Sequence, residues 1–245
     1  SIGRVSSLAR ASQPGLLAVD YPQGDGYATG TIKTDGTVSI SGKLADHAAI
    51  TASAPLSKVN RWPLFAQLYV LKGSFSTWIN MDESATDTDM TSSSVHWFRP
   101  YQATQWYPWG WGEGIEVDII GAHYAPSPAS VFSVPLPVDA LNGNATLTFS
   151  DGQLAAPVVK AVNINITNVA TKAPATDASF TFTLTPSTGL ISGTYFTHTD
   201  LTKPAWQGVL FQKGTNKARY GYFMTVSPRV VDGTGESGAV KLLAR

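Results

Sequence analysis

The aromatic stretch Trp106-Tyr-Pro-Trp-Gly-Trp111 is the part of this sequence best suited to binding chemistry. If the segment is extended, the rings at positions 107, 109 and 111 point to one face, because side chains alternate along a strand. Flat aromatic rings fit the apolar C–H face of a pyranose, and Tyr and Trp add a hydrogen-bonding group. The stretch therefore predicts a glycan-binding platform, with burial in a core or in an interdomain contact as the alternative. The predicted ligand-binding residues are Gln105, Trp106, Tyr107, Trp109, Trp111 and Glu113.

The carboxylates of Glu116 and Asp118 are the strongest indication of an enzyme. The segment that contains them resembles the Glu-x-Asp-x-x-Glu strand of family 16 glycoside hydrolases. On a strand the two side chains would face the same side about 7 Å apart, and a retaining glycosidase needs two carboxyl groups about 5–5.5 Å apart. The third acidic position of that motif holds Gly121, which offers no acid or base. We therefore assign no catalytic residue, and a glycoside hydrolase with a degenerate motif is the second alternative to a non-catalytic role.

A calcium site is the one possible cofactor site in the sequence. Asp82, Asp87 and Asp89 stand close together in a loop rich in Thr and Ser. Oxygen ligands at this density can hold Ca²⁺. The spacing differs from that of an EF-hand, so a solvated acidic loop is the alternative. The chain has no cysteine, which excludes disulfide bonds and thiolate metal sites.

Composition narrows the class of partner. Only 14% of the 245 residues are charged, and the formal net charge is zero. Because nucleic-acid binding needs a basic footprint, nucleic acid is not expected as a partner. No apolar run approaches the roughly 20 residues of a membrane-spanning helix, so membrane insertion is not expected. Thr, Ser, Gly and Asn make the chain soluble in place of charge, which is common in extracellular β proteins.

Alternation of hydrophobic and polar residues predicts antiparallel strands with one buried face. The segments 38–44, 162–167 and 180–185 alternate in this way. Turn signals such as Asp35-Gly36 and Asp151-Gly152 separate such segments. No stretch of ten or more residues has a helical period. The sequence therefore predicts an all-β fold, either an antiparallel sandwich or a barrel.

Two parts of the chain share an order of motifs that suggests an internal duplication. Each has an Ile-Ser-Gly segment, at 40–42 and 191–193, and then a Trp-led segment, at Trp62 and Trp206. A Lys-Gly turn and an aromatic strand follow in both. We expect two meander halves. The expected boundaries are a linker or leader at 1–14, a first half at 15–125, a Pro-rich connection at 126–137 and a second half at 138–245.

Several motifs together resemble a C-terminal all-β module of large exported proteins from Verrucomicrobia, Planctomycetes and their relatives. They are Gly36-Thr-Val-Ser-Ile-Ser-Gly-Lys-Leu-Ala-Asp46, Trp62-Pro-Leu-Phe65, Trp97-Phe-Arg-Pro100 and Tyr107-Pro-Trp-Gly-Trp111. The resemblance implies a secreted or cell-envelope location in a bacterium and a place after other repeat domains, but no reaction. It also implies that Tyr107 and the bulky residue at 111 are structural, whereas Trp106 and Trp109 are additions to the family pattern.

Together these observations favour a non-catalytic extracellular β domain that uses an aromatic platform for carbohydrate binding or adhesion. Its expected partner is a polysaccharide or surface glycan. The first alternative is a structural or assembly domain of a surface protein, whose partners would be the neighbouring domains of a larger chain.

Overall fold

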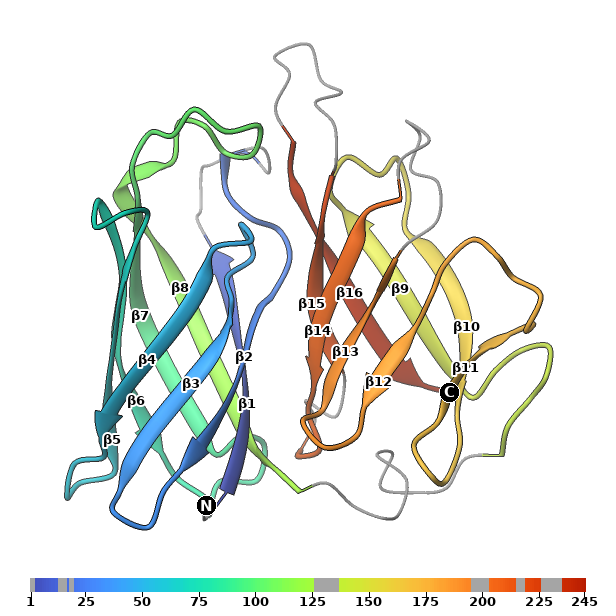
Figure 1. Cartoon of the computed structure of the whole chain (residues 1–245), viewed down its shortest axis with the longest axis horizontal. Coiled ribbons are helices and arrows are strands. Elements are labelled where there is room, and N and C mark those ends of the chain that lie inside the picture. The colour runs from blue at the N-terminus through green and yellow to red at the C-terminus, as the bar shows by residue number, and fades with distance from the viewer. Residues whose placement is uncertain are drawn as a thin grey trace.

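The computed structural model describes residues 3–12, 17, 20–125, 137–194, 203–214, 219–225 and 235–245. These residues form two eight-stranded antiparallel sheets, which lie side by side in Figure 1. The all-β prediction is therefore confirmed. Among the described residues, no helix has the length and apolar character needed to cross a bilayer.

The first sheet has the strand order β4-β3-β2-β1-β8-β7-β6-β5. Its strands are β1 (Gly3–Ser12), β2 (Gly26–Ile32), β3 (Thr37–Lys43), β4 (Ala49–Pro55), β5 (Arg61–Leu68), β6 (Gly73–Met81), β7 (Met90–Arg99) and β8 (Trp111–Tyr124). The second sheet has the order β11-β10-β9-β16-β15-β14-β13-β12. Its strands are β9 (Ala145–Asp151), β10 (Val158–Ile164), β11 (Ala170–Ala173), β12 (Thr183–Thr185), β13 (Leu190–Thr194), β14 (Ala205–Leu210), β15 (Arg219–Met224) and β16 (Ser237–Ala244).

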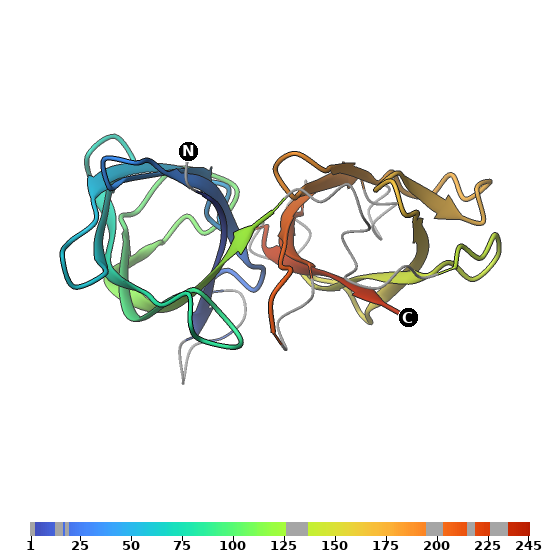
Figure 2. The same cartoon turned by 90° about the horizontal axis from the view of Figure 1, so that it is seen from below.

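Each sheet curls toward a closed ring, as the view along the strands in Figure 2 shows. Consecutive strands pair along each meander except β4 with β5 and β11 with β12, which are the ends of the sheets. The first strand also pairs with the last, β1 with β8 and β9 with β16. In the first sheet the remaining gap is narrow, because β4 and β5 lie next to each other. This pairing leaves few free sheet edges, which limits unwanted strand addition from other chains.

Strand alternation gives each curled sheet a buried inner face and a more exposed outer face. In β5, Trp62, Leu64, Ala66 and Leu68 are buried, and the residues between them are exposed or half-buried. Large aromatic side chains fill both interiors. They are Trp62, Phe75 and Trp97 in the first sheet and Phe149, Trp206 and Phe223 in the second.

The structure corrects two expectations about organisation. Residues 3–12 were expected in a linker or leader, but they form strand β1, because their backbone supplies the pairing partner that both β2 and β8 need.

The two sheets separate between Tyr124 and Ala145, and most of the expected Pro-rich connection, 126–136, lies outside the described residues. Both halves are meanders, but their similar motifs occupy different strand positions. β13 pairs directly with β14, whereas β4 lies between β3 and β5.

The two sheets contact each other through a small cluster built on Ala122, Val209 and Phe211. Hydrogen bonds surround this cluster. Tyr27 Oη donates to Gln207 Oε1 at 2.7 Å, and Asp25 N donates to Gly221 O at 3.1 Å. The two sheets are therefore joined by both apolar and polar contacts.

Candidate functional site

Most of the aromatic stretch lies in the loop between β7 and β8, and Trp111 is the first residue of β8, so the expectation of one extended face is wrong. Tyr107 has a φ of 46° and Gly110 a φ of 63°, both in the left-handed region. A Cβ at Gly110 would lie 2.3 Å from Arg99 O, so the turn needs glycine there. Because the chain reverses at these positions, the alternation of a strand is lost. Tyr107 and Trp111 pack against each other in the interior, whereas Trp109 is exposed.

Arg99 at the end of β7 holds this loop in place. Its guanidinium is buried and forms an ion pair with the buried carboxylate of Asp46. It also donates to Tyr107 O at 3.2 Å and to Trp106 O at 2.9 Å. Tyr69 Oη donates a further hydrogen bond to Asp46, at 2.7 Å. Burial, followed by the neighbouring Asp46 carboxylate, raises the pKa of Tyr69 well above its ordinary range.

Three of the predicted ligand-binding aromatics stabilise the structure. Tyr107 is buried, and its Oη accepts a hydrogen bond from Ser237 N at 2.7 Å. Burial raises the pKa of Tyr107 above its ordinary range. Trp111 is buried against Trp97, with 4.8 Å between ring centroids. Trp106 is half-buried, and its Nε1 donates to Thr225 O at 2.5 Å. The loop is therefore tied to the second sheet by two of its rings.

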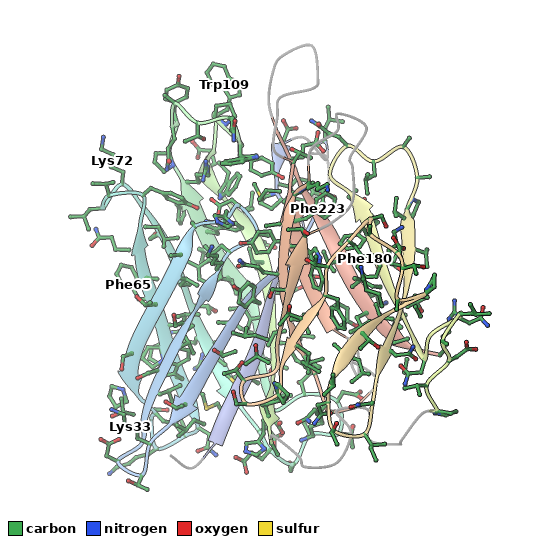
Figure 3. The ribbon with its side chains drawn as sticks, turned by 45° about the vertical axis from the view of Figure 1, so that its right-hand side comes forward. Lys33, Phe65, Lys72, Trp109, Phe180 and Phe223 are labelled. Atoms are coloured by element: carbon green, nitrogen blue, oxygen red, sulfur yellow. The ribbon has the colours of Figure 1, made fainter. Side chains whose placement is uncertain are left out.

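Trp109 behaves differently from its neighbours, since its ring is 80% exposed. Tyr101 is 63% exposed, and its ring centroid lies 5.4 Å from that of Trp109 with 48° between the planes. Figure 3 shows Trp109 at one end of the first sheet, pointing away from the strands. Gln105 and Glu113, the two polar members of the predicted site, are also exposed. We call Tyr101 and Trp109 the end pair.

The carboxylates of the glycosidase-like motif lie on the outer side of β8. Glu116 and Asp118 are exposed and alternate with buried Ile115, Val117 and Ile119. Gly121, at the third position of the motif, is buried and pairs with Met90 of β7.

The three predicted calcium ligands are not brought together as a metal site. Asp89 forms an ion pair with Lys213 of the second sheet, and its Oδ2 accepts from His123 N at 2.7 Å. Asp82 instead accepts from Ser84 N at 3.0 Å. Within the part of the chain that the structure describes, no group of three His, Cys, Asp or Glu residues is arranged to hold a metal ion. The carboxylate of Asp89 instead links the two sheets through Lys213, and calcium binding stays a prediction.

Sequence reasoning missed Arg99 and the end-pair residue Tyr101. Arg99 shares strand parity with the buried Val95 and Trp97. A cation on the buried side of a strand needs a buried anion beside it. The position of Arg99 among buried residues was therefore the sequence signal for a buried ion pair. Tyr101 gave no such signal, because its proximity to Trp109 depends on the turn between them.

Comparisons of the chain with protein-family models, with curated proteins and with solved structures gave no match.

Proposed function

We propose that this chain is a non-catalytic, secreted or cell-envelope module that binds a glycan through the end pair. The observation that supports this most directly is the contrast within one loop. Tyr107 and Trp111 are buried, whereas Trp109 is almost fully exposed beside Tyr101. Exposed Trp and Tyr rings contribute little burial energy to folding. Their position on the surface therefore favours a role in contacting a ligand.

Hydrogen bonds also anchor the loop that carries the end pair. Arg99 binds two carbonyl groups of the loop, and Gly235 N of the second sheet donates to Gln105 O at 2.6 Å. Tyr and Trp side chains lose little conformational entropy on binding, because each has only two χ angles. A prepositioned pair of rings therefore suits stacking against the C–H faces of sugar rings, with Gln105 and Glu113 available for hydroxyl groups.

The test is retention of the purified chain on insoluble cellulose, chitin, xylan and β-1,3-glucan and on immobilised polygalacturonate. We expect retention on at least one polymer, and we expect the double substitution Tyr101→Ala/Trp109→Ala to weaken it about tenfold or more. Trp106→Phe is the matched control, because it removes the hydrogen bond to Thr225 without changing the end pair. It should lower the melting temperature and leave retention unchanged.

Failure to bind any of these polymers would refute the proposal and leave a structural or assembly role. Equal loss of retention in the control and in the double variant would also refute it, since binding would then depend only on the integrity of the loop.

A further inference from the structure

A second set of exposed aromatic residues lies on the outer side of strands β5, β6 and β7. Phe65 is 62% exposed, Trp78 53% and Phe98 36%. These residues lie on three neighbouring strands, since Phe65 pairs with Ser76 of β6 and Phe98 pairs with Ser74 of the same strand. We call this surface, defined by Phe65, Trp78 and Phe98, the β5–β7 face.

Two depressions lie along this face. One has a volume of about 500 Å³ and is lined by residues that include Arg61, Phe65 and Trp78. The other has a volume of about 490 Å³ and is lined by residues that include Phe65, Lys72 and Phe98. Both depressions are open to solvent, so they suit a ligand that lies along the surface. Because Phe65 lines both depressions, they adjoin at this ring, and we call the two depressions together the track.

The track leads toward the end pair. Pro100 lines the second depression and directly precedes Tyr101. Figure 3 shows Phe65 and Lys72 along the outer side of the first sheet, on the way to Trp109. An extended polymer on the track could therefore also reach Tyr101 and Trp109, whereas a single sugar could not.

The charges along the track are positive. Arg61 lines the first depression, with its Cζ 5.3 Å from the centre of the Trp78 ring, and Lys72 lines the second. No Asp or Glu lines either depression. Neither cation has a carboxylate within ion-pair distance among the described residues. In a chain with no net charge, two unpaired cations beside aromatic rings favour an anionic ligand.

Neutral hydrogen-bonding side chains also line both depressions. Gln67 and Ser74 line the second depression, and Thr77 and Asn80 line the first. These groups match sugar hydroxyls, the rings match sugar C–H faces, and the cations match carboxylates. We infer that the β5–β7 face binds an acidic, uronic-acid-containing polysaccharide as an extended chain. This inference rests on the proposed function and names its ligand class.

The experiment compares binding of the whole chain to polygalacturonate and to its methyl ester, which keeps the sugar rings but removes the charge. We expect the methyl ester to bind at least about tenfold more weakly, and we expect salt to weaken binding to the acid form. Arg61→Gln and Lys72→Gln should each weaken acid-form binding about fivefold to tenfold. Lys33→Gln is the matched control, since Lys33 is exposed in the turn between β2 and β3, lines neither depression and lies far from Trp109 in Figure 3. It should have no effect.

Three results would overturn the inference. The first is equal binding of the acid and its ester. The second is an equal effect of Lys33→Gln and Lys72→Gln. The third is equal competition by polyglutamate, which would assign the face to an acidic polypeptide.

The failure of this inference differs from the failure of the proposed function. If neutral polymers are retained through the end pair while Arg61→Gln and Lys72→Gln change nothing, the module binds glycans but the ligand class is wrong. If no polymer is retained at all, both proposals fail together.

Discussion

The two sheets share a meander topology but place their aromatic residues differently. In the first sheet and its β7–β8 loop, five aromatic rings are exposed, those of Phe65, Trp78, Phe98, Tyr101 and Trp109. In the described part of the second sheet and its loops, the exposed large hydrophobic residues are all aliphatic: Val138, Leu141, Val159, Ile166, Val169 and Leu243. Among its described residues the second sheet exposes no aromatic ring, whereas the first sheet exposes several.

This difference suggests that the two sheets have separate roles. A ring in a core contributes its burial energy to folding, and a ring on the surface does not. The second sheet also supports the loop of the first, because Thr225 accepts from Trp106 and Ser237 donates to Tyr107. We interpret the second sheet as a support and the first sheet as the binding half.

The largest expected effect is in the core of the second sheet. Phe149 is fully buried and packs edge-on against Trp206 and Phe223. Phe149→Ala should lower the free energy of unfolding by about 3–5 kcal/mol, because it removes buried area and leaves a cavity. Urea unfolding followed by tryptophan fluorescence would measure this. The fraction of the variant that remains folded should bind polymer with unchanged affinity. A loss of affinity in this folded fraction would show that the support and binding roles are not separate.

Replacing Arg99 should affect both stability and binding. Arg99→Met leaves the carboxylate of Asp46 buried without its cation, which typically costs about 3–5 kcal/mol. We expect the lower end of that range, since Tyr69 Oη and Ala48 N still donate to Asp46. The loop loses its contacts with Arg99, so retention on polymer should fall even at temperatures where the protein is folded.

The double variant Arg99→Met/Asp46→Leu is the control for Arg99→Met, because it removes the uncompensated charge. It should recover part of the lost stability but not the retention. If it recovers both, Arg99 has no separate role in positioning the loop.

Alternation is a local property, so the sequence predicted where strands lie but not all of their bounds. The expected segments 162–167 and 180–185 are strands only over 162–164 and 183–185. The segment 38–44 reads as a strand from its residue types alone, and β3 is there. Strand β1 was missed because the polar residues 3–12 show no alternation, and they form a strand only through their pairing with β2 and β8. Pairing over long distances in the chain leaves no local pattern.

The candidate site was only partly predictable for the same reason. Residue type made Trp109 a candidate, but its exposure follows from a turn that depends on Gly110 and on the distant Asp46 through Arg99. The sequence does contain a local signal for the exposed aromatic residues of the β5–β7 face. Phe65 is a large aromatic at an outward position, between the inward Leu64 and Ala66.

Substitutions on the β5–β7 face should change stability only slightly. Phe65→Ser should change the free energy of unfolding by less than about 0.5 kcal/mol, since the ring is mostly exposed. Trp78→Ser should cost about 0.5–1 kcal/mol, because the ring also lies beneath Arg61. Urea unfolding of both variants measures this. A loss above about 2 kcal/mol in either would show that the rings are structural, and the comparison between the two sheets would then break down.

The smallest expected effect concerns the pH dependence of the contact between the sheets. His47 Nε2 lies 2.9 Å from Lys43 Nζ, and His47 Nδ1 lies 2.9 Å from Tyr222 Oη of the second sheet. A lysine ammonium can only donate, so Nε2 must be the unprotonated nitrogen and Nδ1–H donates to Tyr222. Burial, and then the charge of Lys43, lower the pKa of His47 below its ordinary value, while Asp46 opposes this shift.

The sign of the pH effect follows from that lowered pKa. Below about pH 6.5 the unfolded chain takes up a proton at His47 more readily than the folded protein does, so acidification favours unfolding. The contribution of His47 to the free energy of unfolding is fully present above about pH 6.5 and is lost as the pH falls below that value. The stability difference between wild type and His47→Gln should therefore be largest near pH 7.5 and shrink toward about pH 5.5. Thermal unfolding of both proteins across this range tests the prediction. A difference that stays constant would mean that protonation of His47 does not weaken the contact between the two sheets.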